Sequence, residues 1–206
     1  MNPVEIRLQG LRLARGGRDL FAPISACIAP GAFVAVRGAN GMGKTSLLRA
    51  LAGLLKPQAG LIAFSRAAAS LDRDEARQCC LLLSHEDALK AQRTPRQEAR
   101  YWALALGGQL ENVDGALRRM GLAAQADLPC HRLSAGQRRR AALVRLLLTD
   151  RSIWLLDEPA TNLDESGRAV LAGLIAAQRA RGGAVVAALH ESWDVPDAAL
   201  IALEAL

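Results

Sequence analysis

The sequence predicts an α/β fold with a mainly parallel sheet, an antiparallel β-layer and an inserted helical lobe. Apolar runs that suit buried strands alternate with segments whose apolar residues recur at helical spacing. This order is typical of a parallel sheet covered by helices on both faces. A glycine-rich loop, Gly38–Thr45, joins one such strand to one such helix and matches the pattern G-x-x-x-x-G-K-[ST]. A length of 206 residues suits a single domain, residues 1–206.

The elements before the loop predict the antiparallel layer. Val4–Leu13 alternates apolar and polar residues, as a half-buried strand does. Gly16–Asp19 predicts a turn, and Ile24–Ile28 predicts a second strand that ends at Pro30-Gly31. Ala32–Val36 then predicts the buried strand that leads into the loop.

The elements after the loop alternate between helix and strand. Ser46–Gly53 predicts a helix, and short strands are expected at Leu61–Phe64 and Leu81–His85. Residues 88–148 are rich in Ala, Leu, Arg, Gln and Glu, which predicts a helical lobe inserted into the core. After it we expect a buried strand at Ile153–Glu158, a helix at Glu165–Arg181, a buried strand at Ala184–Leu189 and a terminal strand at Ala198–Leu206.

Composition limits the class of protein. The chain is 51% hydrophobic, yet no apolar run reaches the ~18–20 residues that cross a bilayer. Its first residues lack the basic start and apolar core of a secretion signal, so we expect a cytosolic chain that only a partner holds at a membrane. Cys27, Cys79, Cys80 and Cys130 form no C-x-x-C pair, which favours reduced thiols and argues against a zinc site.

The charge balance leaves the type of partner open. A net charge of +6 suits nucleic acid, an anionic membrane face or neither. The basic residues are scattered apart from Arg138-Arg139-Arg140, and one Tyr and three Phe leave few platforms for base stacking. We therefore expect no nucleic-acid partner.

The glycine-rich loop predicts a site for a nucleotide phosphate chain. Its glycines let backbone N–H groups turn toward phosphate, and the following helix adds its positive N-terminal end. Lys44 suits the β- and γ-phosphates and Thr45 suits Mg²⁺. The alternative, a turn with a chance lysine, is disfavoured by the strand–loop–helix order. The predicted binding residues are Gly38, Ala39, Asn40, Gly41, Met42, Gly43, Lys44 and Thr45.

Two acids, Asp157 and Glu158, end an apolar strand, where an α/β sheet places its ligand site. Asp157 suits Mg²⁺ and Glu158 suits polarisation of an attacking water. Two solvated acids at a strand end are the alternative, but the phosphate loop upstream favours the functional interpretation.

The stretch Leu133-Ser134-Ala135-Gly136-Gln137 predicts a second anion-binding helix start. Ser134 is a good N-cap, and Gly136 permits close backbone approach. An ordinary capped helix is the alternative. These five residues, placed shortly before Asp157-Glu158, resemble the signature of the ATP-binding cassette ATPases.

The resemblance covers the whole chain, with the family's motifs in the family's order. It implies a P-loop nucleotide hydrolase that uses ATP and Mg²⁺, with Thr161–Asp164 as a dimer-contact loop and His190 as the switch histidine. It also implies that Ser134, Gly136 and Gln137 act on the ATP held by a second ATPase subunit, so the working unit is a dimer.

Two positions depart from the family pattern. Arg15 stands where an aromatic residue usually stacks on adenine, and its planar guanidinium can also stack. His85 stands where a glutamine usually contacts Mg²⁺ and water, and a neutral imidazole can still ligate.

Within the family, the runs Lys44–Arg49 and Leu133–Arg139 most resemble the ATPase subunits of cytochrome c maturation systems. The resemblance implies integral membrane subunits as partners, heme handling, and a peripheral position at the cytoplasmic face of the bacterial inner membrane. The family's membrane contact falls on residues 86–102, although a solvated basic face is the alternative there. No C-x-x-C-H motif occurs, and we predict no direct heme site.

Three other functions compete with this one. The ATPase of another importer or exporter would share every motif. A soluble cassette protein that acts on ribosomes or DNA usually has two cassettes or a long coiled coil. A kinase built on the same phosphate loop is disfavoured by Leu133–Gln137.

Overall fold

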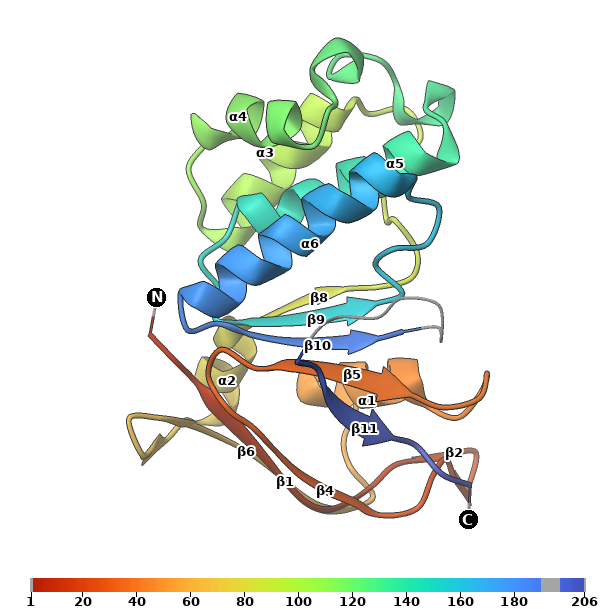
Figure 1. Ribbon diagram of the computed structural model, residues 1–206, viewed down its shortest axis with the longest axis vertical. Helices are drawn as coiled ribbons and strands as arrows, with labels where there is room; N and C mark the ends of the chain where they lie inside the picture. Colours follow the sequence, from red (N-terminus) through yellow and green to blue (C-terminus); the bar gives the residue numbers. More distant parts are fainter. Residues whose placement is uncertain (1, 190–196, 206) are drawn as a thin grey trace. The chain divides into compact units, whose positions relative to one another are not determined.

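The computed structural model describes residues 2–189 and 197–205 (Figure 1). The described residues form two compact units. The first comprises Met1–Leu82, Arg151–Pro159 and Ala176–Leu206, and the second comprises Leu83–Asp150 and Ala160–Ile175. The predicted lobe at 88–148 lies within the second unit, which also includes the segment after Pro159.

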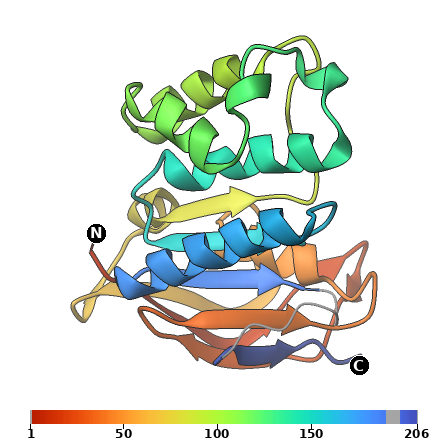
Figure 2. The same cartoon turned by 45° about the horizontal axis from the view of Figure 1, so that its top comes forward.

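A mainly parallel five-stranded sheet of order β11-β5-β10-β9-β8 confirms the predicted fold class (Figure 1). Strand β10 pairs in parallel with both β5 and β9, and β11 pairs in parallel with β5. Every residue of β9 and β10 is buried, as the apolar runs predict. The strands are β5 (Phe33–Arg37), β8 (Cys80–Leu83), β9 (Ile153–Asp157), β10 (Ala184–Ala188) and β11 (Ala199–Ala202). The terminal strand β11, dark blue, lies beside the orange β5 in Figure 2.

The predicted antiparallel layer is a four-stranded sheet of order β4-β1-β6-β7 in the first unit. Ile6 and Leu8 of β1 are fully buried, which accounts for the alternating pattern, and the register shifts before Leu11, which is also buried. The strands are β1 (Glu5–Arg12), β4 (Ile24–Ile28), β6 (Ala59–Arg66) and β7 (Ala69–Ser70). A small hairpin of β2 (Ala14–Arg15) and β3 (Arg18–Asp19) contains the predicted glycine turn.

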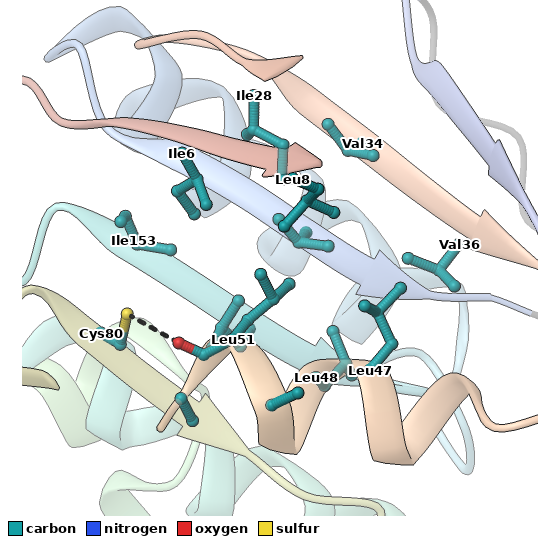
Figure 3. Packing of buried hydrophobic residues seen from close by; sticks show 14 of the residues in the cluster. Ile6, Leu8, Ile28, Val34, Val36, Leu47, Leu48, Leu51, Cys80 and Ile153 are labelled. Carbon is teal, nitrogen blue, oxygen red and sulfur yellow. Dashed lines mark hydrogen bonds between the residues drawn. The ribbon is translucent and has the colours of Figure 1, made fainter. Parts of the chain in front are cut away.

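Helix α1 (Lys44–Leu51) packs against β9 and β10 in the first unit. Its Leu47, Leu48 and Leu51 are buried in one apolar cluster with residues of both sheets (Figure 3). The thiol of Cys80 donates a hydrogen bond to the Leu51 carbonyl at 3.8 Å in the same cluster. Burial raises the pKa of Cys80 to about 12, so this thiol stays protonated and inert at neutral pH.

Helix α2 (Arg73–Cys79) has no counterpart among the predicted elements. Asp72 caps it by accepting from the backbone of Glu75, whose side chain accepts from the Asp72 backbone in return. This reciprocal capping box is visible in the sequence as Asp followed three residues later by Glu.

The second unit is mainly helical, as the composition of residues 88–148 predicts. Helix α3 begins after a Thr94–Gln97 capping box with proline in its first turn, and it ends at Gly107 in the left-handed conformation. Helices α3 and α4 pack against each other. The helices are α3 (Pro95–Leu106), α4 (Asn112–Arg119) and α5 (Ala135–Leu143), with 3₁₀ turns η1 (Ala123–Gln125), η2 (Cys130–Arg132) and η3 (Val144–Leu147). Helix α6 (Glu165–Ala180) begins in this unit.

Among the described residues, no helix is both long enough and apolar enough to cross a membrane.

The irregular pairing of β1 with β6 near Gly10 and Gly60 supplies a test of packing. Gly60 has φ +83°, and a Cβ there would lie 2.3 Å from the Gly10 carbonyl oxygen, whereas Gly10, at φ +52°, has open space around it. Gly60→Ala should therefore lower the free energy of unfolding by about 2–4 kcal/mol, because backbone must move. Gly10→Ala is the matched control and should cost only about 1–2 kcal/mol of backbone strain. Urea denaturation followed by circular dichroism measures both, and equal losses would contradict the close approach.

Candidate nucleotide-binding site

The phosphate loop is packed on one side and open on the other. Gly43, at φ +94°, caps α1, and a Cβ there would lie 3.1 Å from atoms of both Leu20 and Phe21. Gly41, at φ +81°, would place a Cβ in open space, and Ala39 is exposed as well. Gly43 thus permits tight packing against Leu20 and Phe21, and Gly41 leaves the backbone on the open side of the loop unobstructed.

The side chain of Lys44 folds back onto the first residues of the loop. Its side chain is only 9% exposed, and its Nζ donates hydrogen bonds to the carbonyl oxygens of Gly38 at 2.6 Å and Ala39 at 3.2 Å. No residue in the first turn of α1, all of which is described, is acidic. The ammonium group and the helix N-terminus therefore add positive potential at one place, as an anion site requires.

Thr45 and Asp157 meet at the carboxyl edge of the parallel sheet. Thr45 Oγ1 donates to Asp157 Oδ2 at 2.7 Å, and Asp157 is only 4% exposed. A hydroxyl and a carboxylate are hard oxygen ligands of the kind Mg²⁺ prefers. No group of three or more acidic, His or Cys residues that could hold a metal occurs in the described part of the chain. The pair therefore fits Mg²⁺ in the mode where phosphate oxygens and water complete the coordination.

Glu158 has an unusual backbone. Its φ is +47°, which is uncommon for a residue other than glycine, and its N–H donates to the Ala188 carbonyl at 3.0 Å. The end of β10 thereby holds Glu158 in a conformation that costs on the order of 1–3 kcal/mol. Such strain is concentrated at functional sites, which supports the predicted role of this carboxylate.

Arg15 lies in the small β2–β3 hairpin and is exposed. The hairpin leads directly into Leu20 and Phe21, the residues that a Cβ on Gly43 would approach to 3.1 Å. The guanidinium is therefore accessible in the same unit as the phosphate loop, and its stacking on a base stays a prediction.

The predicted signature stands at the start of α5 in the second unit. Ser134 Oγ accepts from the Gln137 backbone at 3.2 Å, and the Gln137 side chain accepts from the Ser134 backbone at 3.0 Å. Ser134 is exposed, as a residue that acts on a second subunit must be. A Cβ on Gly136 would lie 2.9 Å from the Asn162 carbonyl oxygen, so the close approach at this glycine is to a loop of the same chain.

Two other predicted residues stand apart from these groups. His85 is exposed on the segment after β8, in the second unit. His190 lies outside the described residues, so its role stays a prediction.

Arg139 and Arg140 are structurally important residues that motif matching does not single out. Arg140 pairs with Asp164 and also donates to Ser166 Oγ at 2.8 Å. The pKa of Asp164 is lowered by the Gly167 backbone N–H and by Arg140, so its carboxylate stays charged at neutral pH. The run Arg138-Arg139-Arg140 is visible in the sequence, but a run alone does not reveal its partners.

Comparisons with known proteins agree on one family. A sequence model described as "ABC transporter" matches residues 21–161. The chain is 44% identical over 205 residues to the "Cytochrome c biogenesis ATP-binding export protein CcmA" of Maricaulis maris, covering 100% of this chain and 94% of that protein. It is 45% identical over 187 residues to the protein of the same name from Bradyrhizobium diazoefficiens, covering 90% and 92%.

Solved structures support the fold. A putative ABC transporter ATP-binding protein from Pyrococcus furiosus superposes with a TM-score of 0.82 at 22% identity, covering 97% of both chains. The cbiO1 protein of Clostridium perfringens, part of the ABC transporter complex cbiONQ, gives 0.75 at 24% identity, covering 97% of this chain and 84% of that one.

Lys44→Ala should weaken ATP binding at least about tenfold and reduce turnover, because a charge-assisted hydrogen bond is worth ~1.5–3 kcal/mol. Titration with a fluorescent ATP analogue and phosphate-release assays measure the two effects. Lys56→Ala removes an exposed lysine of the same unit and is the matched control. ATP affinity and turnover that match those of the control would contradict the assignment of Lys44.

Proposed function

The chain belongs to the ABC transporter family of ATPases, in the group of the cytochrome c biogenesis ATP-binding export proteins, and we propose that its ATP hydrolysis drives membrane subunits in c-type cytochrome maturation. The pairing of Thr45 with Asp157 beside the Lys44 loop supports the ATPase chemistry, and the 44% identity to a cytochrome c biogenesis ATP-binding export protein supports the role in maturation. In this proposal the chain takes part in heme handling at the cytoplasmic face of a bacterial inner membrane. The membrane subunits determine which group is transported. Both compact units serve one ATPase domain.

The loop binds the phosphate chain of ATP through its backbone N–H groups and Lys44. Thr45 and Asp157 would hold Mg²⁺, which would neutralise charge on the phosphates. The family resemblance also gives His85 a contact with Mg²⁺ or its water. Arg15 stacks on the base through its guanidinium.

Glu158 orients and polarises the attacking water, since it follows Asp157 at the sheet edge and is fixed by the end of β10. His190 follows the same strand and contacts the γ-phosphate. Ser134, Gly136 and Gln137 complete the site from a second copy of the chain, so two ATP molecules lie between two subunits.

The partner surface lies on the exposed side chains of α3. Tyr101 is 51% exposed and Leu104 is 68% exposed, next to the exposed Arg100. Arg93 lies with its guanidinium 5.1 Å from the centre of the Tyr101 ring. Exposed aromatic and arginine side chains are the usual anchors of protein interfaces, which supports docking of a membrane subunit here.

Two residues of the predicted stretch 86–102, Arg96 and Trp102, make contacts inside the second unit and are not part of this exposed surface. Arg96 donates to both carboxylate oxygens of Asp127, at 2.8 and 2.9 Å, and also pairs with Asp114. Trp102 is partly buried and lies under the guanidinium of Arg145 at 4.3 Å. A test of the surface must leave both residues intact.

Glu158→Gln should retain ATP affinity within about twofold and reduce the rate of hydrolysis by at least about a hundredfold, because general-base catalysis contributes ~10²–10⁴-fold. ATP should then accumulate and hold two chains together, so size-exclusion chromatography with ATP and Mg²⁺ should show a dimer. A variant that stays monomeric with ATP and hydrolyses it at the parent rate would contradict the role of Glu158.

The double variant Arg100→Glu with Tyr101→Ala should release the chain from membranes and abolish cytochrome c maturation, while ATP affinity stays within about twofold, since anchor residues can contribute more than 2 kcal/mol each. The assay is sedimentation and c-type heme staining in cells whose own ATPase subunit is deleted. Arg119→Glu with Leu128→Ala changes the same charge and a similar apolar area elsewhere on this unit. Equal behaviour of the two pairs would place the docking surface elsewhere.

A further inference from the structure

The three consecutive arginines of α5 contact three different parts of the second unit. Arg138 donates to the Leu133 carbonyl at 2.7 Å, at the start of its own helix. Arg139 contacts the segment Ser84–Asp87, and Arg140 contacts the segment Asp164–Ser166. The basic run therefore makes contacts inside the second unit.

Arg139 fixes the segment that contains His85. Its side chain is 2% exposed, and Nη1 lies 3.2 Å from the carbonyl oxygens of Ser84 and His85 and from Asp87 Oδ1. A buried charge is strongly unfavourable unless it is paired and hydrogen-bonded. This segment can move away from α5 only by breaking these contacts and leaving the guanidinium unsatisfied.

Arg145, which follows α5 in η3, strengthens the same attachment. It donates to the carbonyl oxygens of Asp87 and Ala88, and its guanidinium covers the Trp102 ring. Burial lowers its pKa to about 10, so it still carries its charge at neutral pH.

Arg140 holds a second segment, residues 160–167, against α5. It pairs with Asp164, which also accepts from the Gly167 N–H at 2.9 Å. A Cβ on Gly167 would lie 3.2 Å from Arg140 Nε, and one on Gly136 would lie 2.9 Å from the Asn162 carbonyl oxygen. The segment 160–167 and the first turn of α5 are therefore too closely packed to move independently.

We propose that Arg139 and Arg140 are positioning residues that couple the His85 segment to the segment 160–167 through helix α5. The two arginines are neighbours on one rigid helix, so a displacement of either segment is transmitted to the other. This inference deepens the proposed function and rests on it. In the proposed function, His85 contacts the nucleotide of its own subunit, and the loop Thr161–Asp164 contacts the second subunit. Nucleotide occupancy in one chain would thus be transmitted to the dimer contact.

Amide hydrogen exchange tests the coupling in the ligand-free chain. The amides of Leu163 and Gly167 donate to the Ala160 carbonyl and to Asp164, so their exchange reports on the second segment. Arg139→Gln, which removes the hydrogen bonds to Ser84, His85 and Asp87, should raise the exchange rates of Leu163 and Gly167 roughly threefold to thirtyfold. Arg138→Gln, the adjacent change, should leave both rates within about twofold.

Exchange effects at Leu163 and Gly167 that are no larger for Arg139→Gln than for Arg138→Gln would overturn the proposal. If Arg139→Gln does not fold, Arg140→Gln provides the reciprocal test at the Lys90 amide, which donates to the buried Glu98 carboxylate at 3.3 Å just beyond the first segment. An unchanged Lys90 rate would then overturn it in the same way. Neither measurement needs nucleotide, so a chain that proves unable to bind ATP would refute the proposed function without deciding the coupling.

Turnover supplies the functional readout. In the partner-bound ATPase, Arg139→Gln should lower kcat roughly threefold to thirtyfold with KM for ATP unchanged, because the phosphate loop is not altered. Arg139→Lys keeps the charge but loses the planar fork, so it should restore less than half of the lost kcat. A loss that appears in KM alone, or full rescue by lysine, would contradict a positioning role.

Discussion

The contact between Thr45 and Asp157 is the constraint on which the site depends, and it is a product of strand order. The two residues are 112 positions apart in the chain, and they meet because β5 and β9 are both neighbours of β10. Parallel pairing brings the carboxyl ends of all three strands to one edge. The same edge then receives Lys44 from the start of α1 and Glu158 after the end of β9, so one arrangement of strands brings four predicted site residues of the first unit to one edge.

That arrangement also explains why backbone strain at Glu158 is tolerated. A φ of +47° is unfavourable for glutamate, and the unit compensates by pairing the Glu158 N–H with the last residue of β10. The fully buried strands β9 and β10 are the most strongly determined part of the fold, because apolar burial and hydrogen bonding both fix their register. A strained residue is best held at the end of such a strand, where a hydrogen bond to the neighbouring strand fixes its backbone.

The sequence predicts the elements that repeat a simple physical pattern and misses those that depend on particular tertiary partners. Buried strands and the phosphate loop follow from apolar runs and glycine spacing, and even the short strand β11 could be expected. Arg96 illustrates the limit, because its exposed-looking position in a basic stretch gives no sign of the bidentate contact with Asp127, 31 residues away. Trp102 is similar, since only the fold brings Arg145 over its ring. The remaining miss, α2, has a local signal in its capping box and could have been found.

The stability that explains the apolar core of the second unit does not explain why charged side chains are buried there. Arg139, Arg145 and Glu98 are each less than 5% exposed, and apolar side chains of similar volume would in general stabilise such positions as well or better. What an apolar side chain cannot do is hold named carbonyl groups of a loop at fixed distance and direction. The arginines of α5 and η3 contact mostly backbone carbonyl oxygens rather than carboxylates, so they determine the path of the chain around His85 more than they neutralise charge. For the coupling proposed above, a segment of defined path and a rigid attachment to α5 matter more than additional stability.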